Sequence, residues 1–334
     1  MVGVGKKNHR APLGQFLLEW TTPRVLPFDN SFTQGRKGMN YLPQRILTLL
    51  RRVDLRRNPL RAIHRRIAWR LRWKLVPNKL WLVRAHGSFP LLMTRSGAGA
   101  LIYYQGASEP ETANFIKCTL KPGMVFVDVG AHIGEYTILA AELVRPAGCV
   151  HAFEPNPPVF KVLMQNIQLN NCHNVAASPH ALWHEEGLCE FEATPDPSTS
   201  ALRALGAKRD SATFFKVYTQ TLDRYFAVPR QAKPGLIKID VEGAELNVLR
   251  GSKGLLQQPP LQAPVLIFEY GPLNMERFDY SPQALITFIR ELGYLLYTWQ
   301  NGALVRVENG PVLEANSSTC NLVAAKMPLS VSFS

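Results

Sequence analysis

The sequence predicts an α/β fold: a doubly wound, mostly parallel sheet with a small N-terminal addition of strands and helix and a basic N-terminal arm. From about residue 78, short continuous apolar segments alternate with amphipathic segments that have helical spacing. This alternation is typical of parallel strands that helices cover on both faces of a sheet. A glycine-containing turn follows the segment at 124–130, and four apolar segments end in an acidic residue. Since parallel sheets bind ligands at that end of their strands, the same pattern predicts a site.

Residues 1–77 form a basic extension of the predicted domain at 78–334. They contain 17 lysine and arginine residues against three acidic residues, a difference of +14, so the remaining 21 basic and 22 acidic residues leave −1. Residues 1–42 are rich in Gly, Pro, Asn and Arg and show no periodicity. This composition predicts a loosely ordered arm.

The segment at 43–75 is predicted to contain an amphipathic helix, although WRLRWKLV at 69–76 also alternates as a strand would. Its apolar residues form one stripe among many arginines. They are Leu60, Ile63, Ile67, Leu71 and Leu75. Two hypotheses fit: a surface helix that contacts an anionic membrane or a polyanion, or a helix whose stripe packs against the domain while its arginines stay in water. Nucleic-acid binding is not favoured, because only Trp69 and Trp73 could stack on bases there.

The domain begins with three short strands and a helix that starts at Ser108. Strands and helices then alternate, with an insertion of hairpin-like strands between 185 and 220. The predicted strands lie at 79–85, 90–95, 100–105, 124–130, 149–155, 174–180, 189–193, 213–220, 235–243, 263–271, 294–299 and 320–327. The predicted helices lie at 108–120, from Ile133 onward, and at 158–170, 244–251 and 282–293. Four strand ends carry the acids Asp128, Glu154, Asp240 and Glu269.

The turn after the strand at 124–130 has the spacing D-x-G-x-x-x-G, with Asp128, Gly130 and Gly134. Glu154 lies 20 residues after Gly134, the distance expected of a carboxylate that binds ribose hydroxyls. A dinucleotide would bring its pyrophosphate close to Asp128, and like charges at short range in a half-buried site repel strongly. S-Adenosylmethionine has an adenosine but no phosphate, and it carries a sulfonium and an ammonium. The pattern therefore favours S-adenosylmethionine, with a tight turn that binds nothing as the alternative.

Four segments resemble the FkbM family of class I S-adenosylmethionine-dependent methyltransferases, over about residues 78–326. They are VDVGAHIGEYT at 127–137, FEPNPPVF at 153–160, LNN at 169–171 and LIKIDVEGAEL at 236–246. The resemblance implies a Rossmann-like, seven-stranded sheet whose last strand is antiparallel. It also implies methyl transfer to an oxygen, commonly a hydroxyl of a sugar or polyketide.

The resemblance also assigns cofactor contacts. Asp128, Gly130 and Gly134 line the methionine end, and Glu154 binds the ribose. Ala131, His132, Pro155 and Asn156 belong to the same predicted site, and Ala181 and Leu182, in the turn PHALW at 179–183, lie along the adenine. His132 stands where the family usually has Asn. It either donates a hydrogen bond to the methionine carboxylate or faces the substrate as a base.

An alcohol is a poor nucleophile while it is protonated, so a base or a metal should assist the transfer. Asp240 is the predicted catalytic residue, and Glu242 and His132 are further candidates. Acids in this arrangement can act as a base, hold a divalent cation or cap a helix. Glu242 is either functional or a helix cap, Glu245 is predicted to be structural, and Glu269 could complete a metal site with Asp240. We expect no metal dependence.

Two hypotheses from other classes stay open: a dinucleotide-dependent oxidoreductase, and a catalytically inactive methyltransferase-like domain that binds membrane or polyanion through its basic arm. The expected acceptor is a small molecule or a glycan. Five scattered cysteines without a C-x-x-C pair indicate reduced thiols, and no apolar stretch is long enough to span a membrane. These features predict a cytoplasmic protein, with peripheral membrane contact as a further hypothesis.

Overall fold

The computed structural model describes residues 58–77, 79–202, 213–227, 232–300, 302–308 and 319–329. The predictions for residues 1–57 lie outside the described residues. Among these residues, the main sheet has eight strands in the order β13-β12-β14-β11-β10-β3-β4-β5. Its strands are β3 (Val125–Val129), β4 (Cys149–Phe153), β5 (Val175–Ser178), β10 (Leu236–Ile239), β11 (Val265–Tyr270), β12 (Leu295–Gln300), β13 (Ala303–Arg306) and β14 (Cys320–Ala325).

The predicted doubly wound, mostly parallel sheet is confirmed. Strands β5, β4, β3, β10 and β11 are parallel neighbours, and β14, the last strand in the chain, is antiparallel to β11 and β12. The seven strands implied by the family resemblance are therefore present. Strand β13 adds an eighth at the edge, as the antiparallel hairpin partner of β12.

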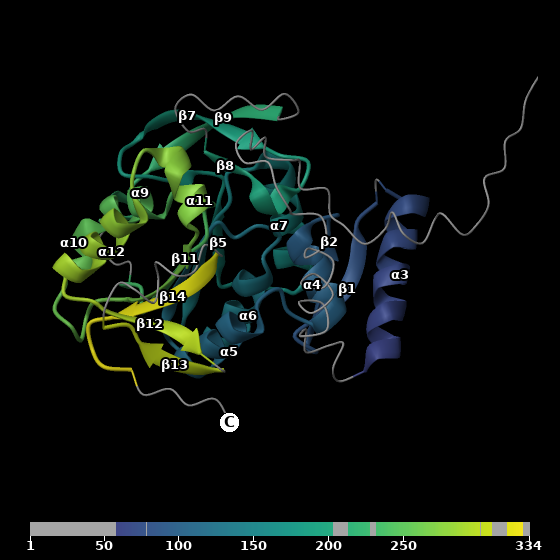
Figure 1. Cartoon of the computed structure of the whole chain (residues 1–334), viewed down its shortest axis with the longest axis horizontal. Coiled ribbons are helices and arrows are strands. Elements are labelled where there is room, and N and C mark those ends of the chain that lie inside the picture. The colour runs from purple at the N-terminus through teal and green to yellow at the C-terminus, as the bar shows by residue number, and fades with distance from the viewer. Residues whose placement is uncertain are drawn as a thin grey trace, which may run out of the picture. The chain divides into compact units, whose positions relative to one another are not determined.

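Helices cover both faces of the sheet. Successive side chains of a strand point to opposite faces, so each central strand contributes to the core on either side. In β3, Phe126 belongs to one core, whereas Val127 and Val129 belong to the other. Figure 1 shows α9, α10 and α12 on one side of the sheet and α5 and α6 on the other. The helices of the domain are α5 (Pro110–Thr119), α6 (Glu135–Val144), α7 (Pro157–Leu169), α8 (Leu222–Tyr225), α9 (Glu245–Arg250), α10 (Lys253–Leu256), α11 (Pro272–Met275) and α12 (Pro282–Glu291).

The insertion between β5 and β10 forms a small second sheet with the order β6-β9-β7-β8. Its strands are β6 (Ala181–Leu182), β7 (Gly187–Ala193), β8 (Ala201–Leu202) and β9 (Thr213–Gln220). Strands β7 and β9 are antiparallel along their whole length, as the hairpin-like pattern predicted. The side chain of Asp196, just before β8, accepts hydrogen bonds from the backbone N–H of Gly97 and the hydroxyl of Ser198.

The N-terminal addition comprises α3 (Pro59–Leu75), the antiparallel pair β1 (Trp81–Ala85) and β2 (Phe89–Met93), and α4 (Gly97–Gln105). The prediction of a strand at 100–105 was wrong, because these residues belong to α4. Ser96 caps this helix by accepting a hydrogen bond from the N–H of Gly99. A short apolar run such as ALIYY has no period that separates a strand from a helix, and the cap at Ser96 is one local feature that favours the helix.

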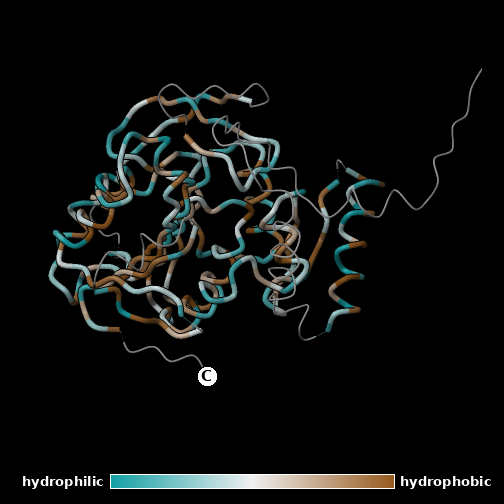
Figure 2. The backbone as a smooth tube through the Cα atoms, viewed as in Figure 1, coloured by the Kyte–Doolittle hydropathy of each residue, from teal (hydrophilic) through white to brown (hydrophobic). Residues whose placement is uncertain are grey.

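Helix α3 forms as predicted, but its orientation contradicts the hypothesis that the aliphatic stripe packs against the domain. The buried residues of α3 are Ala62, Trp69 and Trp73, and the stripe is exposed. Along α3 the colour alternates between hydrophobic and hydrophilic residues (Figure 2). Among the described residues, we find no helix with both the length and the hydropathy to cross a bilayer.

Candidate active site

A cavity opens at the carboxyl ends of β3, β4 and β10. It encloses about 950 Å³, a volume that includes solvent at its open side. Most of the predicted site residues line it: Gly130, Ala131, His132, Glu154, Pro155, Ala181, Leu182, Asp240 and Glu242. Asp128, Gly134 and Asn156 are not among the lining residues. The acids at the strand ends therefore predicted the end of the sheet at which the cavity lies, because parallel sheets bind ligands at the carboxyl ends of their strands.

The glycine turn packs tightly against neighbouring backbone, and two of its amides are hydrogen-bonded within the protein. Gly130 has a φ of +78°, and a Cβ at this position would lie 1.8 Å from the carbonyl oxygen of Asp240. Only glycine permits that approach. The N–H groups of Gly130 and Ala131 donate to the carbonyl of Phe153 at 3.0 and 2.9 Å. Because these amides are occupied, they are not available to bind a pyrophosphate in the way a dinucleotide site requires.

Glu154 is held in place by two backbone amides. Its Oε2 accepts from the N–H of His132 and its Oε1 from the N–H of Asn156, each at 2.8 Å. Burial raises the pKa of Glu154 to about 7, although both amide bonds act in the opposite direction. Each carboxylate oxygen keeps a second lone pair. The residue can therefore accept a further hydrogen bond from a ligand in the cavity.

His132 adopts a left-handed backbone conformation with a φ of +50°. Asn, Asp and His are the non-glycine residues found most often in this region, so a histidine is compatible with this conformation. Burial lowers the pKa of His132 to about 4, so the imidazole is neutral near pH 7. Its Nε2 is buried and has no hydrogen-bond partner among the described residues.

Asp128 lies below the cavity, 1% exposed. Its Oδ2 accepts from the Thr137 hydroxyl at 2.6 Å, its Oδ1 has no hydrogen-bond partner among the described residues, and burial raises its pKa. Gly134, with a φ of +92°, precedes α6, which begins at Glu135 and not at Ile133. The predicted contacts of Asp128, Gly134 and Asn156 with a cofactor stay predictions.

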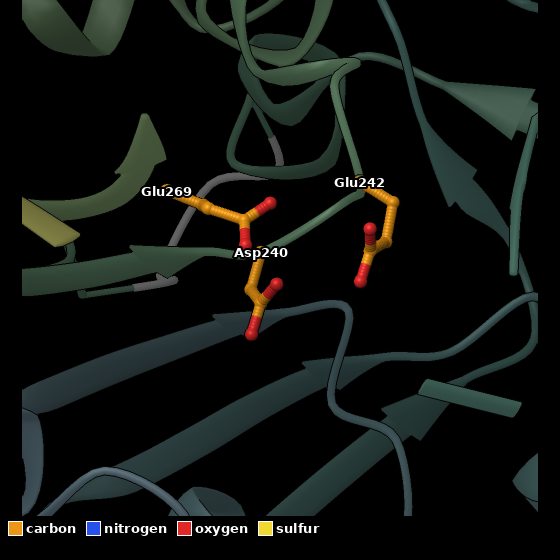
Figure 3. Close-up of side chains that lie close together, drawn as sticks. All are labelled: Asp240, Glu242 and Glu269. Atoms are coloured by element: carbon orange, nitrogen blue, oxygen red, sulfur yellow. The ribbon is translucent and has the colours of Figure 1, made fainter. Parts of the chain in front are cut away.

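Three carboxylates gather at the ends of β10 and β11. Single oxygens of Asp240, Glu242 and Glu269 lie within 4.8 Å of one another, and Figure 3 shows the three carboxyl groups close together. Burial, reinforced by the charge of Asp240, raises the pKa of Glu242 to about 8 and that of Glu269 to about 10. This group has the oxygen ligands that a divalent cation prefers. It can equally hold protons or bind a substrate hydroxyl.

Comparison with known proteins identifies the family. The model of the methyltransferase FkbM domain matches residues 128–296, which is half of the chain and includes both the glycine turn and the carboxylates at the ends of β10 and β11. The chain belongs to the FkbM methyltransferase family. The resemblance stated from the sequence is confirmed.

Three curated relatives match parts of this FkbM chain. Methyltransferase 1 of Beauveria bassiana is 28% identical over 142 residues, which are 37% of this chain and 57% of that protein. The hexuronic acid methyltransferase AglP of Haloferax volcanii is 31% identical over 40% of this chain and 52% of its own length. The 31-O-demethyl-FK506 methyltransferase FkbM of Streptomyces tacrolimicus is 33% identical over 40% of this chain and 60% of its own length. The chain thus spans little more than half the length of these relatives.

Among solved structures, a methyltransferase FkbM from Methylobacillus flagellatus KT is similar to 70% of this chain and 56% of its own chain. Its sequence identity is 14% and its TM-score is 0.39.

Lys238 is a site residue of this FkbM domain that the sequence analysis missed. It is 2% exposed, and its Nζ donates to Oδ2 of Asp240 at 2.8 Å and lies 4.9 Å from the ring centre of Tyr136. Burial alone would lower the pKa of Lys238, but the surrounding carboxylates, Asp240 first, raise it. The lysine is therefore charged and offsets the charge of Asp240. A lysine inside the apolar strand LIKI was the available signal, because lysine is almost never fully buried without a partner.

A polar network on the other side of the FkbM cavity was also missed. The helix predicted to start at Ser108 begins at Pro110 as α5, with Glu109 at its N-cap position. The Ser108 hydroxyl donates to Glu135 at 2.5 Å and lies 3.1 Å from the Tyr136 hydroxyl. Tyr136 in turn donates to Glu109 at 3.2 Å. Ser108, Glu135 and Tyr136 all line the cavity.

Three candidate residues remain, namely Glu245, Glu242 and His151. Glu245, which was predicted to be structural, is fully buried, and its Oε1 accepts from the N–H groups of Val241 and Gly243, both at 3.2 Å. Its Oε2 has no hydrogen-bond partner among the described residues. Glu242 caps no helix and has a left-handed φ of +55°. His151 is a buried core histidine, also as predicted, and its Nδ1 lies 2.9 Å from the Tyr225 hydroxyl.

Proposed function

We propose that the protein is an S-adenosylmethionine-dependent O-methyltransferase that acts on a hydroxyl of a sugar, glycan or polyketide-type acceptor. The observation that carries the proposal is the cavity itself. It combines a glycine turn whose amides are occupied, a carboxylate, Glu154, that two backbone amides hold at the cavity wall, and two carboxylates at the end of β10. Two relatives support the acceptor class by their names, one with a hexuronic acid and one with 31-O-demethyl-FK506.

The lining residues fit S-adenosylmethionine and do not fit a dinucleotide. Glu154 would accept from the ribose hydroxyls, the turn Gly130–His132 would face the methionine end, and Ala181 and Leu182 would lie along the adenine. The acids around the cavity suit the positive charge of the cofactor, whereas a pyrophosphate would meet occupied amides. Bound S-adenosylmethionine supplies a methyl group already activated by its sulfonium.

The residues of β10 would orient the acceptor and remove its proton. Lys238 occupies Oδ2 of Asp240, so Oδ1 can accept the hydrogen bond of an acceptor hydroxyl and hold it in position. Glu242 lines the same cavity, and its raised pKa of about 8 makes it a stronger base than an ordinary carboxylate once it has ionised. We assign orientation to Asp240 and proton removal to Glu242. His132, with its lowered pKa, is the weaker base.

The insertion and the N-terminal addition both contribute to the wall of the cavity. Phe191, Ser198 and Leu202 come from the insertion, and Ala98 and Ile102 come from α4. These five residues would shape the acceptor pocket, because none of them is among the predicted cofactor residues.

Calorimetry with the purified protein tests the cofactor assignment. We expect binding of S-adenosylmethionine and none of NADH. Glu154→Ala should weaken S-adenosylmethionine about tenfold or more, since a hydrogen bond to a charged group contributes roughly 1.5–3 kcal/mol. Glu291→Gln, an exposed acid on α12, is the control and should bind normally. Unchanged affinity in a folded Glu154→Ala protein would remove the cofactor assignment, and NADH binding would favour the oxidoreductase.

A further inference from the structure

Helix α3 has two apolar faces, and the domain covers only one of them. Trp69 and Trp73 are 7% and 5% exposed, whereas the residues of the aliphatic stripe are 50–80% exposed. The stripe consists of Leu60, Ile63, Ile67, Leu71 and Leu75. At 3.6 residues per turn these five side chains occupy about one third of the helix circumference. His64 and Lys74, both exposed, project from the same third of the circumference. An exposed surface that is mostly aliphatic in this way indicates a contact with something other than water.

Contacts on the inner face fix the rotation of α3 about its axis. Arg65 donates to the carbonyls of Tyr103 and Tyr104 at 2.8 and 3.1 Å. The Trp69 ring lies 5.8 Å from that of Tyr103 and 5.7 Å from that of Trp81. Arg72 donates to the carbonyl of Val76 at 2.5 Å. The stripe is therefore held outward by buried aromatic residues and by bonded arginines.

The charge of α3 indicates what the stripe contacts. The helix contains six basic residues and no acidic residue. By helical geometry, Arg61 and Arg70, both exposed, lie on opposite sides of the stripe. An aliphatic stripe with cations on both sides matches the boundary between acyl chains and anionic headgroups. Pairing with α3 of a second copy would instead bring two strongly basic helices together, which is unfavourable.

We infer that α3 binds the surface of an anionic lipid membrane, with its aliphatic stripe inserted among the acyl chains and Arg61 and Arg70 at the headgroups. This binding is independent of the methyl-transfer proposal. It requires the exposed face of α3 alone, and the cavity at the ends of β3, β4 and β10 takes no part.

Flotation of the full chain with lipid vesicles tests the inference. We expect binding to phosphatidylcholine vesicles that contain phosphatidylserine, and much weaker binding to pure phosphatidylcholine. The variant Ile63→Gln/Ile67→Gln/Leu71→Gln should reduce partitioning about a hundredfold through the loss of aliphatic insertion. Arg61→Gln/Arg70→Gln should reduce it about tenfold or more, because each basic group near such a surface strengthens binding severalfold. Arg65 and Arg72 are left unchanged, since they hold backbone carbonyls.

The matched control is Met164→Gln/Leu169→Gln/Leu261→Gln, which removes three apolar side chains that are 44%, 40% and 88% exposed outside α3. It should bind as the wild type does, and all variants should keep the wild-type melting temperature. The inference is overturned if the wild type does not float with anionic vesicles, or if the stripe variant floats as well as the wild type. It is also overturned if the wild type self-associates in sedimentation, the stripe variant does not, and neither binds vesicles, because the occupant is then a second copy.

Discussion

Two groups of carboxylates in this protein, one buried and one half-buried, differ in what their oxygens contact. Glu154 and Glu245 each accept two backbone N–H groups from the loop next to them. Asp240, Glu242 and Glu269 lie close to one another, and the hydrogen bonds that Asp240 and Glu242 accept come from the side chains of Lys238 and Asn274. Backbone amides therefore hold the carboxylates of the first group in place. The second depends on protons, on Lys238 or on a ligand to compensate its charge.

The first group is therefore hydrogen-bonded within the protein before any ligand binds, whereas the second group is arranged to interact with a substrate. Backbone amides hold a carboxylate in one orientation, which suits recognition of an invariant group such as a ribose. In the second group Glu242 and Glu269 have raised pKa values, and acids with perturbed pKa values are concentrated at catalytic sites. The left-handed φ of Glu242 agrees with this interpretation, since strained backbone also gathers at functional sites.

The largest expected effect is that of Asp240→Asn. This change keeps the shape of the side chain but removes the charge that pairs with Lys238 and the acceptor for the substrate hydroxyl. We expect kcat to fall about a hundredfold or more, while the calorimetric affinity for S-adenosylmethionine changes by less than about twofold. Glu291→Gln should change neither quantity. Normal turnover of Asp240→Asn would make the acid structural, and the comparison between the two groups would lose its functional meaning.

The sequence predicted this part of the site because parallel topology places strand ends together. Asp240 and Glu269 lie at the ends of the neighbouring strands β10 and β11. Glu154 follows β4, and the glycine turn follows β3. The order of the strands in the sheet is therefore enough to bring these residues together. Lys238 pairs with an acid only two residues away. The sequence alone does not show whether the lysine side chain points into the site or into solvent, because this depends on packing around Tyr136. The network of Ser108, Glu135 and Tyr136 joins separate segments, and one sequence carries no signal for such contacts.

The orientation of α3 was not predictable from periodicity for a different reason. The helix has an aliphatic stripe and an opposite face with two tryptophans, and both are apolar. A buried tryptophan removes more area from water than a leucine does, and Trp69 also meets Tyr103 and Trp81. The aromatic face therefore packs inward. Hydrophobic periodicity reports that a stripe exists, but the neighbours that decide which face is covered come from β1 and α4.

The pH dependence of methyl transfer should identify the proton acceptor. Glu242 has a pKa raised to about 8, so it becomes a competent base as the pH rises through that value. We expect kcat/KM of the wild type, which reports the free enzyme, to rise with a pKa near 8. In Glu242→Gln this limb should vanish and the rate above it should fall about tenfold or more.

His132→Asn is the matched variant for this profile. The imidazole, with a pKa lowered to about 4, is neutral throughout that range, so the limb near 8 should persist. A profile that rises near 6.5 and loses this limb in His132→Asn would assign the base to the histidine.

A smaller effect concerns stability. The pKa of Glu269 is raised from 4.5 to about 10, so the folded protein retains a proton that the unfolded chain releases between these values. Stability therefore falls as the pH rises through this window. Glu269→Gln cannot ionise and should raise the free energy of unfolding by about 1 kcal/mol or more at about pH 8, with little change near pH 4.5.

Glu154→Gln should gain less at the same pH, or lose stability, because its amide NH₂ would face a backbone N–H that the carboxylate now accepts. Urea unfolding of both variants and of Glu291→Gln measures the three differences. An equal gain in Glu154→Gln and Glu269→Gln would show that the backbone amides do not distinguish the two groups.

The smallest expected effect is that of a chelator. Asp240, Glu242 and Glu269 have the oxygens for a divalent cation, but Lys238 already occupies one oxygen of Asp240, and Glu269 is not among the cavity residues. Glu242 and Glu269 hold protons near neutral pH because their pKa values are raised, so a cation would first have to displace those protons. We therefore expect EDTA to change kcat by less than about twofold. Loss of activity with EDTA, restored by magnesium or manganese and stronger at higher pH, would contradict this expectation. The three carboxylates would then be a metal site, and Lys238 would be a competitor of the ion.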